Sequence, residues 1–322
     1  MNRMAGKVLV VTALIFAGVG LFFQEARAEK KIGVLLWSDE SRYGDSRDGI
    51  LEQMKKEGVA EPKVTFTTEN AGGNKGKAAE ISQKWSTEKF DMVIAVGTSA
   101  AVAVAKEIKT APVIFSMVYD PVDSKIAESW KSSGNNTTGA SPKVPMDQLV
   151  NNLKKLAPVK NLAVLYTPGE KNSEAQLKEL LALQDSAQVK IIPVPVTSKE
   201  EVASIMAEVV NRANAVYLSG SSIVGDSIST IVDIATKAKV VTVTHLQDHA
   251  EKGVLLGVSA DPRSVGRLAG TKAVKVLKGA KPASVPIEMV KKFDVIINMK
   301  TAKEGPIDVP ASFLKGATRV IQ

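Results

Sequence analysis

Small polar side chains recur in this sequence at the points where apolar segments end, and they could bind a small charged molecule. Thr98 and Ser99 follow the apolar run 92–96, and Asp120 follows the run 113–118. Hydroxyls and unpaired N–H groups at a helix N-terminus suit a carboxylate, whereas an aspartate suits an ammonium group. Each position also has an alternative role. Thr98 and Ser99 fit ordinary helix N-caps, and Asp120 fits the start of a helix.

Similar hydroxyl and amide side chains follow apolar runs in the second half of the sequence: Asn172, Ser173, Ser221 and Ser222. In open parallel α/β sheets, ligands bind beyond the carboxyl ends of the strands. If two such sheets meet at these ends, the second group lies opposite Thr98 and Asp120 across a cleft. Asp261, before Pro262, is a further candidate for an ammonium group, or it begins the next helix. Small hydroxyl and amide side chains are better suited to binding a zwitterion or a polyol than to catalysing a reaction.

Aromatic side chains also stand at the ends of expected strands, although aromatic residues make up only 5% of the sequence. They are Trp37, beside Ser38, together with Tyr119 and Tyr166. A ring at a strand end could stack on a ligand or pack beneath a loop. Three such rings favour a ligand with a flat or apolar part.

Patterns typical of enzymes and metal centres are incomplete. Residues 72–78 resemble a phosphate-binding loop but lack the Ser or Thr that would hold magnesium. His245 and His249 have the spacing of zinc ligands on a helix, but Leu246 stands where the catalytic glutamate would be. We therefore expect both histidines to lie at the surface or at a hinge. The sequence therefore predicts a binding protein that is not an enzyme and has no cofactor or metal.

The elements that must position these groups alternate twice along the chain. Apolar runs predict strands in the first half at 31–37, 63–69, 92–96 and 113–118, with helices at 46–57, 77–86 and 100–109. The second half predicts strands at 162–166, 190–196, 215–219 and 239–244, with helices at 173–186, 199–212 and 227–238. This alternation is typical of right-handed βαβ units with covered parallel sheets. We therefore expect an α/β fold of two Rossmann-like, doubly wound lobes.

The connection between the lobes is expected at 132–144, which is rich in Gly, Asn, Ser and Thr and has no apolar periodicity. The elements expected after residue 244 are more than a second lobe needs, so we expect the chain to cross back to the first lobe. They are a strand at 253–259, a helix at 263–277, extended segments at 285–290 and 294–298 and a helix at 311–320. We assign residues 29–141 and 248–284 to the first lobe and residues 142–247 and 285–322 to the second. The chain is therefore expected to cross back and forth at a hinge.

The first 28 residues are expected to be a cleavable signal peptide. Arg3 and Lys7 precede the apolar run 8–23, and Ala26-Arg27-Ala28 fits a signal-peptidase site. A membrane anchor is the alternative, but about 16 apolar residues are short for a span of about 20. The chain has no cysteine, which excludes a lipoprotein anchor and any disulfide. We expect a soluble, monomeric protein of the periplasm.

The composition argues against nucleic-acid binding. Removing 28 of the 322 residues leaves 294, enough for two domains, and lowers the formal net charge from +8 to +6. Only 8 of the 42 basic residues are arginine, and the lysines are scattered over expected helix surfaces without aromatic partners. A lysine-rich, solvated surface accounts for this charge.

Taken together, these residues resemble the substrate-binding proteins of bacterial ABC importers, in the group of the tryptophan- and tyrosine-binding proteins. The resemblance covers nearly all of residues 30–320. Its most specific segments are Glu69-Asn70-Ala71, Gly97-Thr98-Ser99-Ala100, Pro112-Val113-Ile114-Phe115, Asp120-Pro121-Val122, Asn136-Thr137-Thr138-Gly139 and Gly169-Glu170-Lys171-Asn172-Ser173. One departure is Ser219-Gly220-Ser221-Ser222, where those proteins typically have Thr-Asp-Asn at a strand end.

The resemblance implies a type I periplasmic-binding fold, in which a three-segment hinge joins two lobes. A small molecule is held between the lobes and passed to an inner-membrane permease and its ATPase. An amino acid or related compound is the implied ligand. A ligand-sensing module for a chemoreceptor or kinase is the alternative function. The candidate ligand-binding residues are Trp37, Ser38, Asn70, Thr98, Ser99, Tyr119, Asp120, Tyr166, Asn172, Ser173, Ser221, Ser222 and Asp261.

Overall fold

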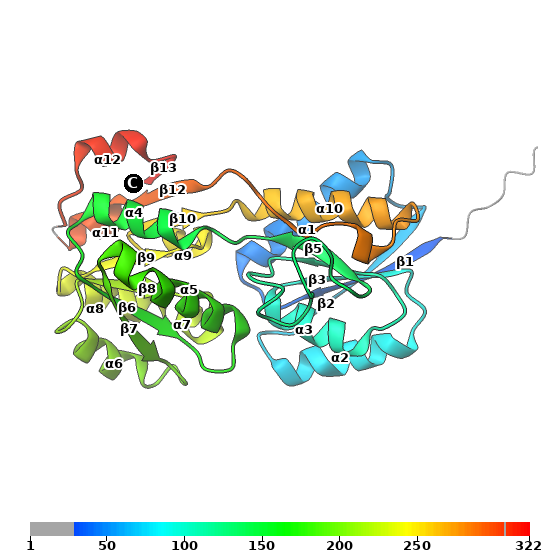
Figure 1. Cartoon of the computed structure of the whole chain (residues 1–322), viewed down its shortest axis with the longest axis horizontal. Helices are drawn as coiled ribbons and strands as arrows, with labels where there is room; N and C mark the ends of the chain where they lie inside the picture. Colours follow the sequence, from blue (N-terminus) through cyan, green and yellow to red (C-terminus); the bar gives the residue numbers. More distant parts are fainter. Residues whose placement is uncertain (1–28, 306) are drawn as a thin grey trace, which may run out of the picture.

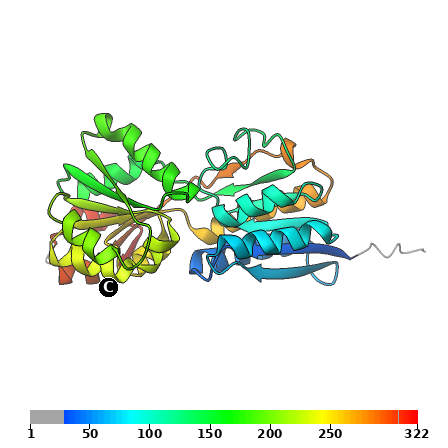
Figure 2. The ribbon, with the colours of Figure 1, turned by 90° about the horizontal axis from the view of Figure 1, so that it is seen from below.

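The chain forms two lobes, each with one sheet covered by helices on both faces (Figures 1 and 2). This computed structural model describes residues 29–305 and 307–322, so the expected signal peptide at 1–28 lies outside the described residues. The expected two-lobed α/β architecture is confirmed.

The first lobe is built on a six-stranded sheet in the order β11-β5-β4-β3-β1-β2, with parallel pairings throughout. Its strands are β1 (Lys30–Leu36), β2 (Val64–Asn70), β3 (Met92–Val96), β4 (Val113–Ser116), β5 (Thr137–Ser141) and β11 (Glu288–Met289). Its helices are α1 (Ser41–Lys56), α2 (Lys75–Thr87), α3 (Thr98–Glu107), α10 (Pro262–Leu277) and the 3-10 turn η1 (Pro282–Ser284). The strands β3 and β4 are buried along their whole length because helices cover both faces of the sheet.

The second lobe has a seven-stranded sheet in the order β13-β12-β10-β9-β8-β6-β7. Its strands are β6 (Asn161–Tyr166), β7 (Lys190–Pro195), β8 (Ala215–Leu218), β9 (Val241–Thr244), β10 (Leu256–Ser259), β12 (Asp294–Asn298) and β13 (Arg319–Ile321). Its helices are α4 (Met146–Leu156), α5 (Lys171–Ala187), α6 (Val202–Val209), α7 (Ser222–Asp226), α8 (Ile228–Lys237), α9 (Gln247–Glu251), α11 (Met299–Glu304) and α12 (Ala311–Gly316). The pair β10–β12 is antiparallel, unlike the parallel sheet that was expected.

The two lobes repeat one strand order. In the first lobe β1 lies between β2 and β3, and in the second lobe β6 lies between β7 and β8. The strand order therefore reverses beside β1 and beside β6, and ligands of doubly wound sheets bind at the carboxyl ends of strands at such a point. Each lobe offers one such edge, and Figure 1 shows these edges turned toward the junction of the lobes.

The chain crosses between the lobes three times: after β5, between β10 and α10, and between β11 and β12 (Figure 1). The expected boundaries differ from the observed pairings at the second and third crossings. Residues 248–259, assigned to the first lobe, carry the end of α9 and β10, which pairs with β9 of the second lobe. Residues 285–289, assigned to the second lobe, carry β11, which pairs with β5 of the first lobe. A run of apolar residues predicts a strand but does not reveal its partner.

The polar segment at 132–144, expected to be only a connection, contains the buried strand β5. Its polar side chains have backbone partners: Thr138 Oγ1 donates to the Val285 carbonyl at 2.7 Å, and Ser141 Oγ donates to the Tyr119 carbonyl at 2.7 Å. Hydroxyls satisfied in this way can be buried at little cost. The apolar pattern therefore gave no sign of this strand.

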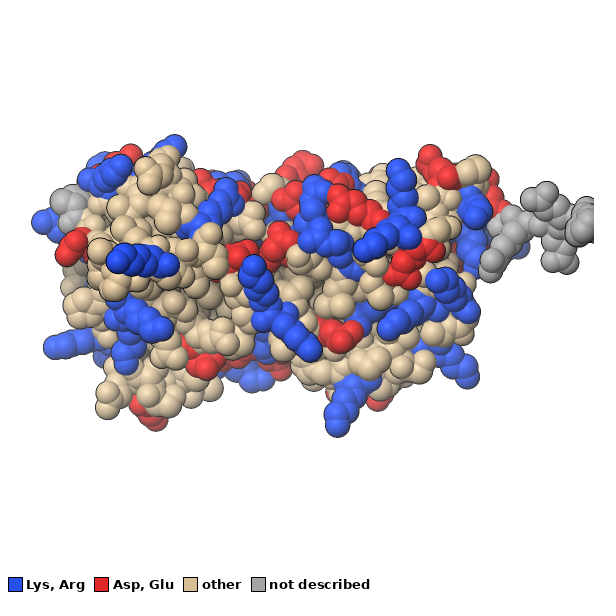
Figure 3. Space-filling model, turned by 90° about the horizontal axis from the view of Figure 1, so that it is seen from above, with Lys and Arg blue, Asp and Glu red and all other residues tan. Residues whose placement is uncertain are grey.

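Acidic and basic side chains are intermingled on the face shown in Figure 3. On α1 and α10, Arg263 lies 3.8 Å from both Asp45 and Asp48, and Arg267 lies 3.6 Å from Glu52 and from Asp261. Exposed pairs of this kind contribute little to stability. They show that Arg263 and Arg267 have acidic neighbours.

Candidate functional site

A small cavity lies between the lobes, at the carboxyl ends of both sheets. Its volume is ≈ 20 Å³. The residues around it are Arg42, Tyr43, Thr98, Met117, Tyr119, Pro142, Asn172, Gln176, Gly220, His245 and Leu246. A space of this size holds about one water molecule, whereas small-molecule sites enclose several hundred Å³. A ligand the size of an amino acid therefore cannot enter while the lobes are this close together.

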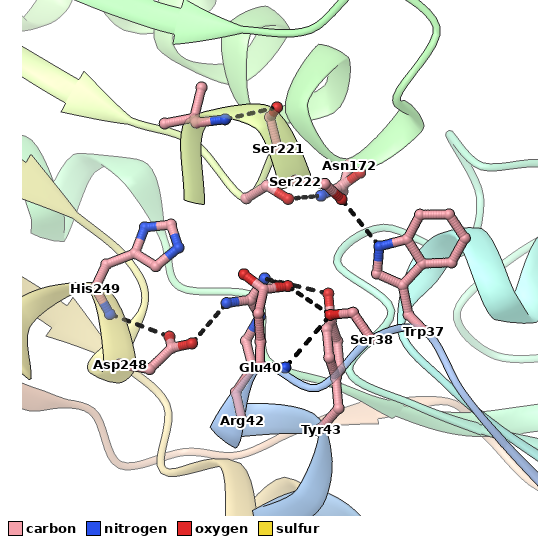
Figure 4. Close-up of polar contacts among 12 residues, drawn as sticks. Trp37, Ser38, Glu40, Arg42, Tyr43, Asn172, Ser221, Ser222, Asp248 and His249 are labelled. Atoms are coloured by element: carbon pink, nitrogen blue, oxygen red, sulfur yellow. Dashed lines mark hydrogen bonds and ion pairs between the residues drawn. The ribbon is translucent and has the colours of Figure 1, made fainter. Parts of the chain in front are cut away.

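Hydrogen bonds also join the two lobes to each other. The Trp37 indole Nε1 donates to Ser222 Oγ at 3.0 Å. The Tyr119 hydroxyl donates to Glu179 Oε2 on α5 at 2.9 Å. Lys75 Nζ donates to the Gly169 carbonyl at 3.0 Å. Figure 4 shows Trp37 pointing across the junction toward the loop that begins α7. These contacts exist only when the lobes are together.

A buried ion cluster also spans the junction (Figure 4). The Arg42 guanidinium is 3% exposed and lies 2.7 Å from Glu40 Oε2 and 2.6 Å from Asp248 Oδ2 on α9. Burial opposes the charge on Arg42, but Asp248, Tyr43 and Glu40 outweigh it and raise the pKa of Arg42 above its usual value. Burial likewise opposes the charge on Asp248, but Arg42 outweighs it and lowers the pKa of that carboxyl. Breaking this cluster leaves buried charges unpaired, which is costly.

Glu40, Asp248 and His249 place possible metal ligands within 4.8 Å of one another. In the described part of the chain, Glu40 Oε1 and both ring nitrogens of His249 are buried without a hydrogen-bond partner. The Arg42 guanidinium already neutralises one oxygen of each carboxylate, so a divalent cation there would be repelled by an adjacent positive charge. The group fits an ion pair between the lobes better than a metal centre.

Thr98 opens α3 directly after β3. Its Oγ1 accepts a hydrogen bond from the Tyr119 backbone N–H at 3.2 Å, and its own hydroxyl hydrogen has no acceptor among the described residues. Gly97, just before it, has φ +105°, and a Cβ there would lie 2.8 Å from Trp37 Cβ. Only glycine fits this turn. Ser99, in contrast, does not border the cavity.

The two aspartates expected to bind an ammonium group have other partners. Asp120 Oδ1 accepts the Val122 and Asp123 N–H groups at 3.0 Å, and Lys143 Nζ donates to its Oδ2 at 2.7 Å. Asp261 caps α10 by accepting the Ser264 N–H at 2.8 Å. It borders a separate surface cavity of ≈ 570 Å³ formed with residues 288–292 and Asp294. Neither carboxylate borders the cavity between the lobes.

The remaining candidates of the first lobe lie around the edge of the site. Trp37 is 4% exposed. Ser38 Oγ donates to Glu40 Oε2 at 2.9 Å, and Asn70 Nδ2 donates to Asp39 Oδ1 at 2.7 Å. Of these, Trp37 alone contacts the second lobe through a hydrogen bond, so Ser38 and Asn70 support the loops after β1 and β2.

Of the candidates in the second lobe, only Asn172 borders the cavity, and the others stabilise the turns and core around it. Asn172 borders the cavity and donates from Nδ2 to the Gly220 carbonyl. Ser173 is fully buried and bonds within its own turn, and Ser221 caps α7 by accepting the Val224 N–H. Ser222 receives the Trp37 indole N–H and donates its own N–H to Glu170, whose pKa is raised by burial. Tyr166 packs against the core on the α4 and α5 side.

Several cavity residues were not predicted from the sequence. Arg42 and Tyr43 lie in the first turn of α1, but that helix was expected to begin at residue 46, which placed them in a loop. Gln176 lies within α5, where nothing in the sequence distinguishes it. His245 and His249 were expected at the surface or hinge, and the surface alternative is wrong because they are 3% and 0% exposed. Arg42 follows the end of β1, just as Thr98 follows the end of β3. The same criterion, a polar residue after a strand end, could therefore have identified Arg42.

No helix among the described residues has both the length and the hydrophobicity to cross a bilayer.

Comparisons with known proteins agree with this arrangement. The ABC domain of Streptococcus pneumonia in complex with L-Trp is 30% identical, with a TM-score of 0.86, covering 91% of this chain and 100% of that one. A conserved domain protein from Vibrio cholerae O1 is 25% identical, with a TM-score of 0.85, covering 90% and 99%. The tyrosine-binding protein of Clostridioides difficile (strain R20291) is 22% identical over 281 residues, which is 87% of this chain and 81% of that protein.

The sequence as a whole also fits one family. The family model described as ABC transporter substrate binding protein matches residues 31–321, which include both lobes and all three crossings. Together with the solved structures, this match confirms the predicted family and the type I periplasmic-binding fold. The chain belongs to the family of ABC transporter substrate-binding proteins.

Proposed function

We propose that this protein is the periplasmic receptor of an ABC importer and that it closes its two lobes on an amino acid or a related small molecule. The observation that carries this proposal is the composition of the cavity wall. Thr98 and Tyr119 come from the first lobe, whereas Asn172 and Gln176 come from the second. A ligand held by both walls stabilises the closed form, and the closed form is the species that docks on the permease and its ATPase.

Export to the periplasm as a soluble monomer belongs to the same proposal. It rests on the basic, apolar and small-residue pattern of residues 1–28 and on the absence of cysteine. Mass spectrometry of the protein purified from the periplasmic fraction would show the N-terminus at Glu29.

Two observations support an aromatic amino acid as the ligand. A relative at 30% identity was solved with L-Trp, and another relative is named a tyrosine-binding protein. In this chain Tyr43 and Tyr119 border the cavity, and Trp37 lies buried beside Gly97. Aromatic side chains contribute large apolar contact areas and well-defined geometry for a flat ligand.

A thermal-shift panel tests the ligand assignment. We expect L-tryptophan or L-tyrosine to raise the melting temperature by several degrees, because a ligand at 100 times its Kd stabilises the folded state by about 2.7 kcal/mol. Glycine and D-glucose serve as control compounds of smaller size and different chemistry. No shift with any aromatic amino acid would remove that ligand class from the proposal.

The bond between Trp37 and Ser222 gives a second expected result. Trp37→Phe and Ser222→Ala each remove this hydrogen bond between the lobes, and each should weaken ligand binding about two- to tenfold, the value of one hydrogen bond. The double variant should bind the ligand as well as the single variant with the lower affinity, because both changes break the same bond. Calorimetric titration of the four proteins completes the cycle. Fully additive losses would show that this bond plays no part in closure.

A further inference from the structure

The second lobe contains a closed ring of hydrogen bonds around Gln176. The Gly220 backbone N–H donates to Gln176 Oε1 at 2.9 Å, which fixes the orientation of the amide. Gln176 Nε2 therefore faces His245 Nε2 at 3.2 Å, and Tyr217 OH lies 2.7 Å from His245 Nδ1. The opposite amide orientation would place an NH2 group against the Gly220 N–H, leaving two buried donors facing each other.

This orientation determines the proton position on His245. Because Gln176 Nε2 is a donor, His245 Nε2 must accept, and a neutral imidazole then carries its hydrogen on Nδ1. Nδ1–H donates to the Tyr217 oxygen, and the Tyr217 hydroxyl hydrogen is directed to Gln176 Oε1 at 3.4 Å. Every polar atom of the ring has a partner. A second proton on His245 would place two donors against each other.

The surroundings of His245 also keep it neutral. It is 3% exposed, the Tyr217 ring stacks on it at 5.9 Å and the Tyr119 ring meets its edge at 5.3 Å. The charged groups nearby are Arg42 and Asp248, which pair with each other, and His249 adds a second buried imidazole. Burial outweighs the attraction of Asp248 for a proton.

The ring leaves one hydrogen of Gln176 unused. An amide nitrogen has two N–H groups, and Gln176 Nε2 has no acceptor other than His245 among the described residues. Gln176 borders the cavity, and so does Thr98 of the first lobe, whose hydroxyl hydrogen has no acceptor among the described residues. No carboxylate belongs to the lining, and its one charged residue is Arg42. A donor-rich wall of this kind suits a ligand acceptor, above all a carboxylate.

We propose that Gln176 is the second lobe's hydrogen-bond donor to a ligand carboxylate, and that Tyr217 and His245 act as positioning residues that aim it. Closure then places the carboxylate between the Thr98 hydroxyl and the Gln176 amide. This inference rests on the proposed function, since it concerns the same site.

The first test needs no ligand. The chain has only two histidines, so nitrogen-15 NMR of histidine-labelled protein resolves both imidazoles, and the His249→Gln spectrum assigns them. We expect His245 to be protonated on Nδ1 alone from pH 7.5 to pH 5.5, and Tyr217→Phe to alter this tautomer. A wild-type spectrum with the hydrogen of His245 on Nε2, or with a charged His245 at pH 6, would contradict the proposed ring of hydrogen bonds.

The second test measures affinity for L-tryptophan and for L-tryptophan amide, which lacks the carboxylate. Wild-type protein should prefer the acid. Gln176→Leu should weaken binding of the acid by about 10- to 100-fold, as expected for a hydrogen bond to a charged group, and should weaken binding of the amide by a smaller factor, because the amide carbonyl is an uncharged acceptor. Tyr217→Phe, which keeps Gln176, should weaken the acid by a smaller factor. Gln148→Leu, the same change at an exposed position of α4, is the matched control.

The outcomes separate the inference from the proposed function. If wild-type protein binds L-tryptophan and Gln176→Leu binds it equally well, the donor role is wrong and the receptor function stands. If wild-type protein binds no aromatic amino acid, the ligand assignment fails and the carboxylate role fails with it, while the NMR result still decides the tautomer. A Gln176→Leu protein that does not fold leaves the decision to Tyr217→Phe.

Discussion

Gly266→Ala is expected to lower the free energy of unfolding by about 3 kcal/mol, the upper range for overpacking a close contact. The helices α1 and α10 approach each other through three glycines without side chains: Gly49, Gly266 and Gly270. A Cβ at Gly266 would overlap the Ser46 carbonyl oxygen, and a Cβ at Gly49 would overlap the Arg263 carbonyl oxygen. Neither obstacle is a flexible side chain, so the helices must separate. The loss should appear in urea unfolding followed by circular dichroism.

Gly44→Ala provides the matched control for this substitution. Gly44 lies in α1, and apart from its chain neighbours and the backbone of its own helix no atom lies within 4 Å of the position where its Cβ would be. In an open helical position, alanine is more favourable than glycine by up to about 1 kcal/mol. The two variants should therefore change stability in opposite directions. Equal stabilities would show that α1 and α10 can move apart without cost.

Acid is expected to destabilise the protein well above the pH range in which most carboxylates titrate. Burial lowers the pKa of His245 and of His249 from the ordinary value of 6.5 to about 3. Between these values the unfolded chain binds protons that the folded chain does not, so acid favours unfolding. Stability should be greatest above pH 6.5. Below it, each histidine should cost about 1.4 kcal/mol per pH unit.

The variant His249→Leu isolates this effect. Both ring nitrogens of His249 lack a hydrogen-bond partner in the described part of the chain, so leucine removes no observed bond. Between pH 7 and pH 5 its stability should fall less steeply than that of the wild type, by up to about 1.4 kcal/mol per unit. Burial raises the pKa of Glu170, which acts in the opposite sense, so the difference between the two proteins is the readout. Parallel stability curves would mean that His249 does not remain neutral.

The alternation of strands and helices could be predicted because most strands are buried on both faces. The strands β3 and β4 are almost continuously apolar, and short apolar runs between helical segments are typical of a covered parallel sheet. The strand β5 could not be predicted in this way, since Thr137, Thr138 and Ser141 are polar and Gly139 packs beneath Phe115. Its burial depends on carbonyl acceptors that only the folded chain supplies.

The site could be predicted only where its residues follow the ends of strands. That rule places Thr98, Tyr119 and Asn172 at the cavity, where the structure has them. It also selects Asp120, whose partner Lys143 lies 23 residues later in the chain and cannot be inferred from local sequence. Gln176, the ligand donor proposed above, could not be predicted, because its partners Tyr217 and His245 belong to other elements.

The return of α10 and β11 to the first lobe has a consequence for the order of folding. Residues 29–141 supply five strands of that lobe, but the helix that packs on the glycine face of α1 begins only at Pro262. A nascent chain that ends before this point has no partner for that face and cannot complete its first lobe. Contacts this distant in sequence form slowly because a long loop must close first. The first lobe therefore lacks part of its core until the C-terminal half of the chain has been made.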